Sequence, residues 1–143
     1  MVIIDEGLPD TDVGDLVSSL GAGVLKPSVP VLVYSPNFWH EREQAAAMRE
    51  FDALATALRD AGVEVIVVDD LSTGRADRVP DAVTLVRLDL ADDRAADRLA
   101  SVMAARPVDA AVHVAAKKQV AESIRHPAWY FRQNVGGLAS LLM

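Results

Sequence analysis

Short runs of apolar, mostly β-branched residues recur along the chain, and each run ends in a polar turn. Strands that are buried on both faces of a parallel sheet have such unbroken apolar runs, whereas half-exposed strands alternate between apolar and polar residues. The runs therefore predict four buried strands, which cover residues 31–34, 63–69, 83–88 and 109–114.

Between these runs, apolar residues recur at spacings of three and four, as they do along one face of a helix. This spacing predicts helices over residues 40–61 and 91–105, with Gly62 as the C-cap of the first. After the fourth strand we expect a loop through Ser123, which is interpreted as a cap on the approach to a last helix. That helix begins near Pro127, since proline suits a first helical turn, and runs to the end of the chain.

This order of elements indicates an α/β fold, a doubly wound parallel sheet of about four strands with helices on both faces. Right-handed crossovers favour the strand order 3-2-1-4. Residues 1–28 are an acidic, weakly patterned lead-in, and residues 29–143 form the domain. Ligands of such sheets bind beyond the carboxyl ends of the strands, so that edge is where we expect a site.

Composition narrows the function classes. The chain has 143 residues, enough for one domain, and its net charge of −7 argues against nucleic acid as a partner. It has no cysteine, which excludes disulfides and thiol catalysis. There is no membrane-length apolar run and no basic signal-peptide start, so we expect a soluble cytoplasmic protein.

The predicted strand 63–69 ends in the acidic pair Asp69-Asp70, and a polar turn to Gly74 follows. In dinucleotide-binding α/β folds, an acid in this place accepts hydrogen bonds from the adenosine ribose, and its charge disfavours a 2′-phosphate. The pattern therefore favours NAD over NADP. A solvated carboxylate without a ligand is the competing interpretation. The corresponding glycine-rich turn is missing, because residues 34–40 contain no glycine.

Four segments carry a family resemblance: residues 67–74, 89–90, 113–123 and 127–138. In these residues the chain, from about residue 62 onward, resembles the extended short-chain dehydrogenase/reductase family. Within that family it is most similar to the UDP-glucose 4-epimerases, which belong to the NAD-dependent epimerase/dehydratase group. The resemblance implies a partial Rossmann-like NAD-binding domain.

The resemblance also implies roles for individual residues. Asp69 holds the adenosine ribose, Asp89 lies near the exocyclic amine of the adenine, and Lys118 offers a charge to a phosphate or ribose. Gln133 stands where the family usually has asparagine. The implied cofactor-binding residues are Asp69, Asp70, Leu71, Ser72, Thr73, Gly74, Asp89, Leu90, Val114, Ala115, Ala116, Lys118 and Gln133.

The chain also departs from the family pattern. Residues 1–49 do not resemble it, and no Tyr-x-x-x-Lys motif occurs, since Tyr34 is followed by Phe38 and Tyr130 by Asn134. We therefore expect a truncated relative of a UDP-sugar isomerase of galactose metabolism, without catalytic residues and inactive by itself. The intact family uses NAD and a UDP-sugar, and a homodimer is possible there.

Two alternatives come from other classes of function. The chain is alternatively a non-catalytic nucleotide-binding or protein-interaction module, with Phe38 and Trp39 as part of its surface. The other alternative is that a separate chain supplies the catalytic half, and a long exposed apolar edge on the fourth strand or the last helix would motivate it. His40 with Glu41 and Glu43 is interpreted as an ordinary helix start, so no metal site is expected.

Overall fold

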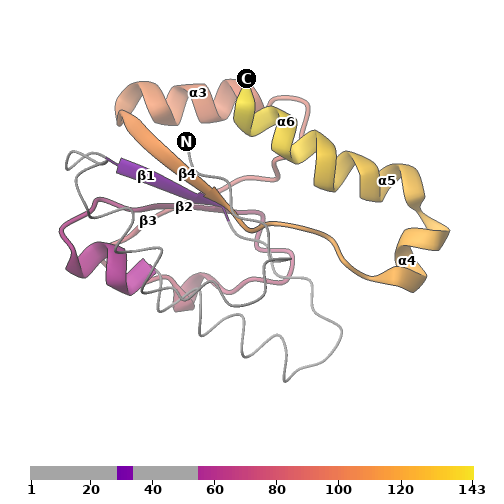
Figure 1. Cartoon of the computed structure of the whole chain (residues 1–143), viewed down its shortest axis with the longest axis horizontal. Helices are drawn as coiled ribbons and strands as arrows, with labels where there is room; N and C mark the ends of the chain where they lie inside the picture. The colour runs from indigo at the N-terminus through magenta and orange to yellow at the C-terminus, as the bar shows by residue number, and fades with distance from the viewer. Residues whose placement is uncertain (1–28, 34–54) are drawn as a thin grey trace.

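The computed structural model describes residues 29–33, as backbone, and residues 55–143. The predicted lead-in at residues 1–28, the turn at residues 34–40 and most of the helix predicted at 40–61 lie outside the described residues. The described part holds a four-stranded parallel sheet in the order β3-β2-β1-β4, which confirms the predicted order (Figure 1). The strands are β1 (Val29–Val33), β2 (Ile66–Asp69), β3 (Thr84–Arg87) and β4 (Val108–His113).

Strand β1 lies between β2 and β4. At its carboxyl end, Val33 pairs with Val68 of β2 on one side and with His113 of β4 on the other. Two strands that are not hydrogen-bonded to each other therefore face one another across the end of β1. This arrangement determines where side chains from the loops after β2 and β4 meet.

The interior strand β2 is buried along its whole length. Ile66, Val67 and Val68 are each at most 1% exposed. Burying such a side chain stabilises a fold by about 1.5–3 kcal/mol relative to leaving it in water. The continuous apolar run that predicted this strand thus reflects burial on both of its faces.

Helices cover the two faces of the sheet (Figure 1). On one face, α3 (Ala95–Ala105) and α6 (Gly137–Leu142) pack over a core that includes Ile66, Val68 and Leu99. On the other face lie the helical residues 55–60, with Ala55 and Leu58 buried. The two-sided covering is the one that the alternation of strands and helices predicts.

The helix at residues 55–60 ends as the sequence predicts, at Gly62. Its φ of +78° lies in the left-handed region that favours glycine. The N–H of Gly62 donates to the carbonyl of Arg59, and the N–H of Val63 donates to the carbonyl of Leu58. These two bonds form a Schellman motif, which satisfies carbonyls at the helix end and turns the chain toward β2.

The C-terminal region contains one more helix than the sequence predicts. Where a loop through Ser123 was expected, residues Val120–Arg125 form α4. The Ser123 hydroxyl donates to the carbonyl of Val120 within this helix, so Ser123 does not cap the next one. The last helix begins at proline as predicted, and consists of α5 (Pro127–Phe131), the π-helical turn η2 (Arg132–Gly136) and α6.

The remaining differences concern boundaries. The second and third strands are shorter than predicted, and the fourth is shifted by one residue toward the N-terminus. The predicted helix 91–105 begins only at Ala95, because residues 91–94 form a turn in which the carboxylate of Asp92 accepts the N–H of Arg94. Between β2 and β3, the short 3-10 helix η1 covers Ala76–Arg78.

Candidate functional site

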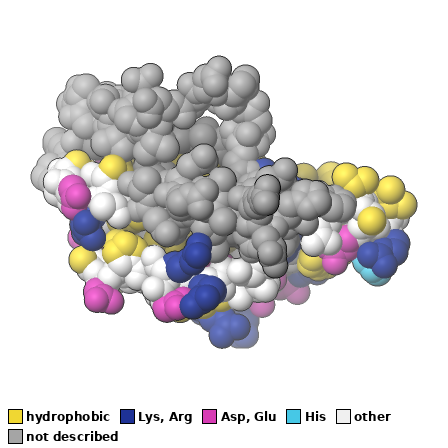
Figure 2. Space-filling view, turned by 90° about the horizontal axis from the view of Figure 1, so that it is seen from below, with side chains coloured by type: hydrophobic (Ala, Val, Ile, Leu, Met, Phe, Trp, Pro, Cys, Tyr) yellow, Lys and Arg dark blue, Asp and Glu magenta, His cyan; other side chains and the backbone are white. Residues whose placement is uncertain are grey.

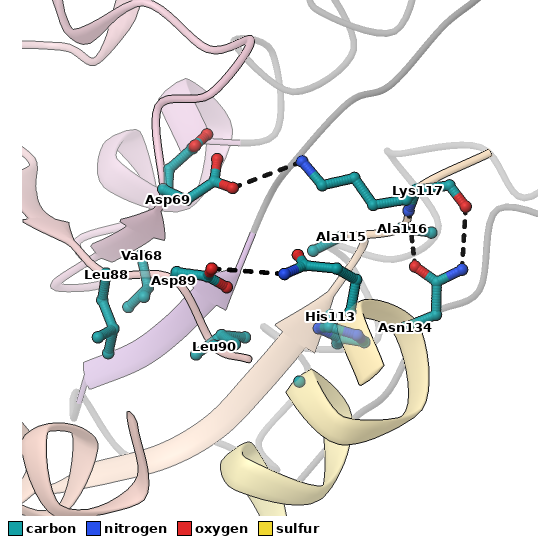
Figure 3. A pocket seen from close by; sticks show the side chains of 13 residues that line it. Val68, Asp69, Leu88, Asp89, Leu90, His113, Ala115, Ala116, Lys117 and Asn134 are labelled. Carbon is teal, nitrogen blue, oxygen red and sulfur yellow. Dashed lines mark hydrogen bonds and ion pairs between the residues drawn. The ribbon is translucent and has the colours of Figure 1, made fainter. Parts of the chain in front are cut away.

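A pocket opens at the carboxyl ends of β2, β3 and β4 (Figure 3), on the side of the sheet where the fold predicts a ligand site. Its lining combines acidic residues from the β2 and β3 loops with small and basic residues from the β4 loop. The lining residues are Val68, Asp69, Asp70, Leu88, Asp89, Leu90, His113, Ala115, Ala116, Lys117, Gln133, Asn134 and Gly137.

Asp69, the last residue of β2, is held by its own loop. Its carboxylate accepts the N–H of Leu71 at 2.6 Å, and Leu71 adopts a left-handed φ of 57° to make this bond. Gly74 lies directly behind the carboxylate, since a Cβ at Gly74 would stand 2.8 Å from Asp69 Oδ2. Glycine is therefore required at this position for the observed placement of Asp69.

The neighbouring carboxyl groups of Asp69 and Asp70 have pKa values shifted in opposite directions. Burial raises the pKa of Asp69 from 3.8 to about 6, and the charge of Asp70 adds to the rise. Burial also acts on Asp70, but hydrogen bonds from Ser72 and the charge of Lys117 hold the pKa of that carboxyl below 3.8. At neutral pH both groups are ionised, with Asp69 the easier to protonate.

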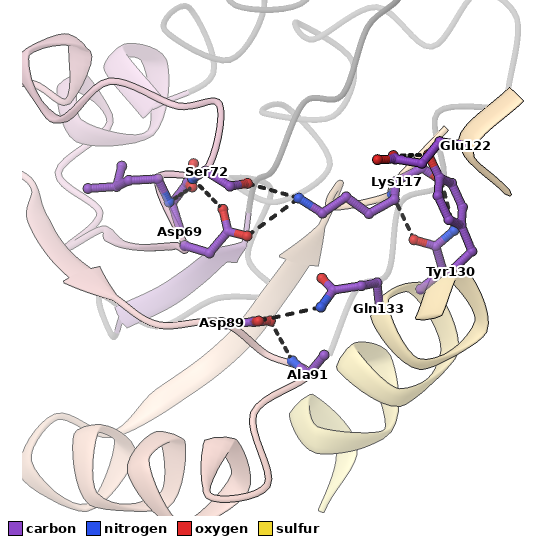
Figure 4. Close-up of polar contacts among 11 residues, drawn as sticks. Asp69, Ser72, Asp89, Ala91, Lys117, Glu122, Tyr130 and Gln133 are labelled. Carbon is purple, nitrogen blue, oxygen red and sulfur yellow. Dashed lines mark hydrogen bonds and ion pairs between the residues drawn. The ribbon is translucent and has the colours of Figure 1, made fainter. Parts of the chain in front are cut away.

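The loop after β3 is built in the same way. The carboxylate of Asp89 accepts the N–H of Ala91 at 2.8 Å. Its other oxygen accepts a longer bond, 3.4 Å, from the side-chain amide of Gln133 on η2 (Figure 4). Asp89 thus connects the sheet edge to the C-terminal helix across the pocket.

Lys117 lines the pocket, although it is not among the implied cofactor-binding residues. Its side chain is 8% exposed, and its ammonium group lies 2.8 Å from the Ser72 hydroxyl and 3.5 Å from Asp70 Oδ2 (Figure 4). The resemblance pointed instead to the adjacent Lys118, which is half-buried and is not part of the pocket lining. The sequence signals for Lys117 are its basic pair with Lys118 near a strand end and its place in the segment 113–123 that carries the resemblance.

The loop after β4 is fixed by side chains from the C-terminal helix. Asn134 accepts the backbone N–H of Lys117 at 2.7 Å and donates to its carbonyl at 2.9 Å, so one side chain satisfies both backbone groups. Tyr130 accepts the N–H of Gln119 and donates to Glu122. Asn134 lies within the π-helical turn η2, a type of irregularity that often occurs at functional sites.

The structure brings together seven of the predicted site residues in the pocket lining: Asp69, Asp70, Asp89, Leu90, Ala115, Ala116 and Gln133. Leu71, Ser72, Thr73 and Gly74 form the loop that supports Asp69 and Asp70, and Val114 and Lys118 flank the lining residues of the β4 loop. The pocket lining also contains residues that are not among the implied cofactor-binding set: Val68, Leu88, His113, Lys117, Asn134 and Gly137.

A second surface feature lies on the C-terminal helices. Large apolar side chains are exposed on α4, α5, η2 and α6, and Figure 2 shows hydrophobic side chains gathered at the end formed by α4 and α5. Ile124 is 75% exposed and Phe131 is 67% exposed. The exposed large apolar residues are Val120, Ile124, Trp129, Phe131, Val135, Leu142 and Met143.

A membrane span and a metal centre are two further kinds of feature to consider for residues 29–33 and 55–143. In this part of the chain no helix has the length and apolar character that crossing a membrane requires. In the same part, no three histidine, aspartate or glutamate side chains come together as metal ligands do. His40, Glu41 and Glu43, interpreted from the sequence as an ordinary helix start, lie outside the described residues.

Comparison with known proteins places these observations in a family. The sequence model of the NAD dependent epimerase/dehydratase family matches residues 52–143. Over 86 residues the chain is 41% identical to the UDP-glucose 4-epimerase of Azospirillum brasilense, and over 90 residues it is 39% identical to that of Streptomyces lividans. These matches cover 60% and 62% of this chain but 24% and 26% of the relatives, so the chain spans about a quarter of their length.

Solved structures give the same result. The structure of a UDP-glucose 4-epimerase from Brucella ovis in complex with NAD matches 80% of this chain and 31% of its own, with a TM-score of 0.62 and 31% identity. The UDP-glucose 4-epimerase of Thermus thermophilus, also in complex with NAD, matches 80% of this chain and 32% of its own, with a TM-score of 0.59 and 25% identity. The sheet is therefore of the Rossmann-like kind that the sequence predicted.

Proposed function

The chain belongs to the NAD dependent epimerase/dehydratase family, and from this we propose that it binds NAD in the pocket at the carboxyl ends of its strands. The observation that carries the proposal is the placement of Asp69. It is an ionisable carboxylate at the end of the second strand, supported from behind by Gly74 and lining the pocket. That is the place from which an acidic residue holds the adenosine ribose in dinucleotide-binding folds.

The other pocket residues fit the remainder of a dinucleotide. Ala115 and Ala116 put no bulky side chain on the first part of the β4 loop, so a flat cofactor is able to lie against its backbone there. Asp89, across the pocket, has the acceptor oxygens that an adenine amine needs. In this proposal Leu90 packs beside the base, and Gln133 contributes a polar contact from the far side.

We further propose that these residues bind the cofactor without turning over a substrate. A bound nicotinamide ring accepts and returns a hydride, but proton transfer in the family is assigned to a Tyr-x-x-x-Lys pair, and the 143 residues contain no such motif. A UDP-sugar as substrate and a homodimer as assembly are properties proposed for the longer relatives.

The exposed apolar side chains of α4 and α5 favour a second candidate function. A soluble protein rarely exposes a contiguous apolar patch unless it contacts another surface. We propose that this face docks against a further protein segment, either a second copy or a chain that carries the catalytic half. Light scattering at increasing concentration tests the first case: a mass that stays at 15.3 kDa throughout excludes self-association.

Calorimetric titration with NAD tests the main proposal. We expect binding by the 143-residue chain, and a 10- to 100-fold loss in Asp69→Ala, which corresponds to removing about 1.5–3 kcal/mol of hydrogen bonding to a charged group. Asp81→Ala is the matched control, because Asp81 is an exposed aspartate outside the pocket lining. NAD binding that is equally tight in both variants, or absent from the unmodified chain, contradicts the proposal.

A further inference from the structure

The side chain of Lys117 spans the carboxyl end of β1. It leaves the loop after β4, and its ammonium group reaches Ser72 and Asp70 in the loop after β2 (Figure 4). Because β1 pairs with β2 on one side and β4 on the other, a side chain that joins those two loops has to pass across the end of β1. This lysine therefore places a positive charge in the lining of the strand-end pocket.

Holding this ammonium group in the pocket costs free energy of solvation. Lys117 is 8% exposed, and an ammonium group so far removed from water loses solvation that one ion pair replaces incompletely. Its contact with Asp70 is long, at 3.5 Å, whereas that with Ser72 is 2.8 Å. The indole ring of Trp129 lies 6.0 Å away, at the outer limit of a cation–π contact.

An ammonium group has three hydrogens to donate. Among the described residues, Ser72 and Asp70 are the two acceptors within hydrogen-bond reach of Lys117 Nζ. One hydrogen remains for an acceptor in the pocket, so an anion is able to join the lysine without displacing either partner. Phosphate oxygens are strong acceptors for such a charged donor.

The sequence shows why a bound phosphate would depend on the positive charge of Lys117. In dinucleotide-binding folds, the amides of a glycine-rich turn after the first strand hold the pyrophosphate, and the turn lies at the carboxyl end of that strand. Here residues 34–40 follow β1, and they contain no glycine and one proline, which has no N–H. Lys117 lies over the same strand end and supplies positive charge from the opposite loop.

We propose that Lys117 is a phosphate-binding residue, which holds the pyrophosphate of a nucleoside diphosphate or dinucleotide in place of the missing glycine-rich turn. This inference rests on the proposed nucleotide function and adds to it a residue and a ligand group. It concerns Lys117 and not Lys118, to which the family resemblance points. The two lysines are adjacent, but only Lys117 lines the pocket.

The test compares adenosine, which has no phosphate, with ADP, using calorimetry on the full 143-residue chain and its variants. We expect the unmodified chain to bind ADP about tenfold more tightly than adenosine, since a charge-assisted contact to phosphate has that strength. In Lys117→Met, which keeps the aliphatic stem, the ADP advantage falls to less than twofold, while adenosine binds as before.

Three further variants make the test specific. Arg125→Met removes a positive charge from an exposed position on α4 and should leave the ADP advantage unchanged. Lys118→Met shows whether the neighbouring lysine carries the effect instead. Because Lys117→Met leaves the Asp70 charge without its partner, Lys117→Met combined with Asp70→Asn provides a folded alternative, in which the ADP advantage should also be lost.

The outcomes distinguish a failure of the Lys117 proposal from a failure of the proposed nucleotide function. An ADP advantage that survives in Lys117→Met and the double variant, or disappears only in Lys118→Met, overturns the role of Lys117. If the unmodified chain binds adenosine and ADP equally, through Asp69, the inference fails while the nucleotide site stands. If it binds neither ligand, nor NAD, both the inference and the proposed function are overturned.

Discussion

The two walls of the pocket differ in how far along the chain the side chains that bind their loop backbones lie. The acidic wall consists of the loops after β2 and β3, where each aspartate accepts an N–H two residues ahead: Leu71 for Asp69, Ser72 for Asp70, Ala91 for Asp89. The opposite wall is the loop after β4. There the backbone of Lys117 is bound by Asn134, 17 residues later in the chain.

The conformation of the acidic wall therefore has local causes, whereas that of the β4 loop depends on the tertiary structure. An aspartate that bonds its own loop forms the same turn wherever the loop is placed, because the acceptor and donor are two residues apart. The β4 loop has its shape only when the C-terminal helix is docked on the sheet. We therefore expect the acidic wall to tolerate loosening of the helix, and the opposite wall to be lost with it.

The largest effect is expected from Asn134→Ala. It removes two hydrogen bonds and leaves the half-buried N–H and carbonyl of Lys117 without their partner, which lowers the free energy of unfolding by about 3 kcal/mol. Urea denaturation followed by circular dichroism measures the change.

Gln133→Ala is the matched control for this substitution, because its side chain comes from the same helical turn and makes a single long bond to Asp89. We expect the control to cost about 0.5 kcal/mol. Equal losses in the two variants would show that the turn itself, rather than the bonds from Asn134, holds the β4 loop.

The same division explains what the sequence predicts and what it does not. The strand order, the cap at Gly62 and the position of Asp69 follow from local patterns of apolar runs, turns and capping residues. The short helix α4 has only six residues, too few to establish a helical period, so the sequence predicts a loop there. Its stability comes from contacts such as the Tyr130 bond to Glu122.

The neighbouring residues Lys117 and Lys118 show most clearly what cannot be predicted from the sequence. Neighbouring side chains leave the backbone in different directions, and it is Lys117 that reaches Ser72. Which one does so depends on how Asn134 fixes the loop, and the Asn134 side chain is in turn aimed by the π-helical turn η2. No pattern within ten residues contains that information.

The next effect, of opposite sign, is expected from Asp69→Asn in the acidic wall. Asparagine keeps an oxygen for the Leu71 N–H but carries no charge, so the cost of burying a carboxylate disappears. A pKa raised from 3.8 to about 6 corresponds to about 3 kcal/mol at most, and in a pocket open to water we expect about 2 kcal/mol of added stability at pH 7.5.

The sign of the pH dependence follows from the raised pKa. The folded chain holds the Asp69 proton more tightly than the unfolded chain does, so the unmodified protein loses stability as the pH rises from about 4 to about 6. Asp69→Asn lacks this loss. Thermal melts from pH 3.5 to 7.5 should therefore show curves that converge at the acidic end. A constant offset across this range would assign the stabilisation to something other than ionisation.

The smallest effect is expected from Gly74→Ala, which tests whether the acidic wall is as self-contained as its short-range bonds indicate. The added methyl group would lie 2.8 Å from Asp69 Oδ2, so the carboxylate has to move. Because the surrounding loop is exposed and is able to shift, we expect a loss of only about 1 kcal/mol, at the lower end of the overpacking range.

Binding should respond to Gly74→Ala more strongly than stability does, because a displaced Asp69 no longer faces the ribose. We expect NAD affinity to fall about tenfold in calorimetry, as for the loss of a charged hydrogen bond. Gly136→Ala is the matched control: its new methyl group meets Arg132 Cγ at an ordinary 3.6 Å, in a helical segment that favours alanine. A Gly74→Ala protein that binds NAD normally would show that the ribose contact does not depend on where Asp69 is held.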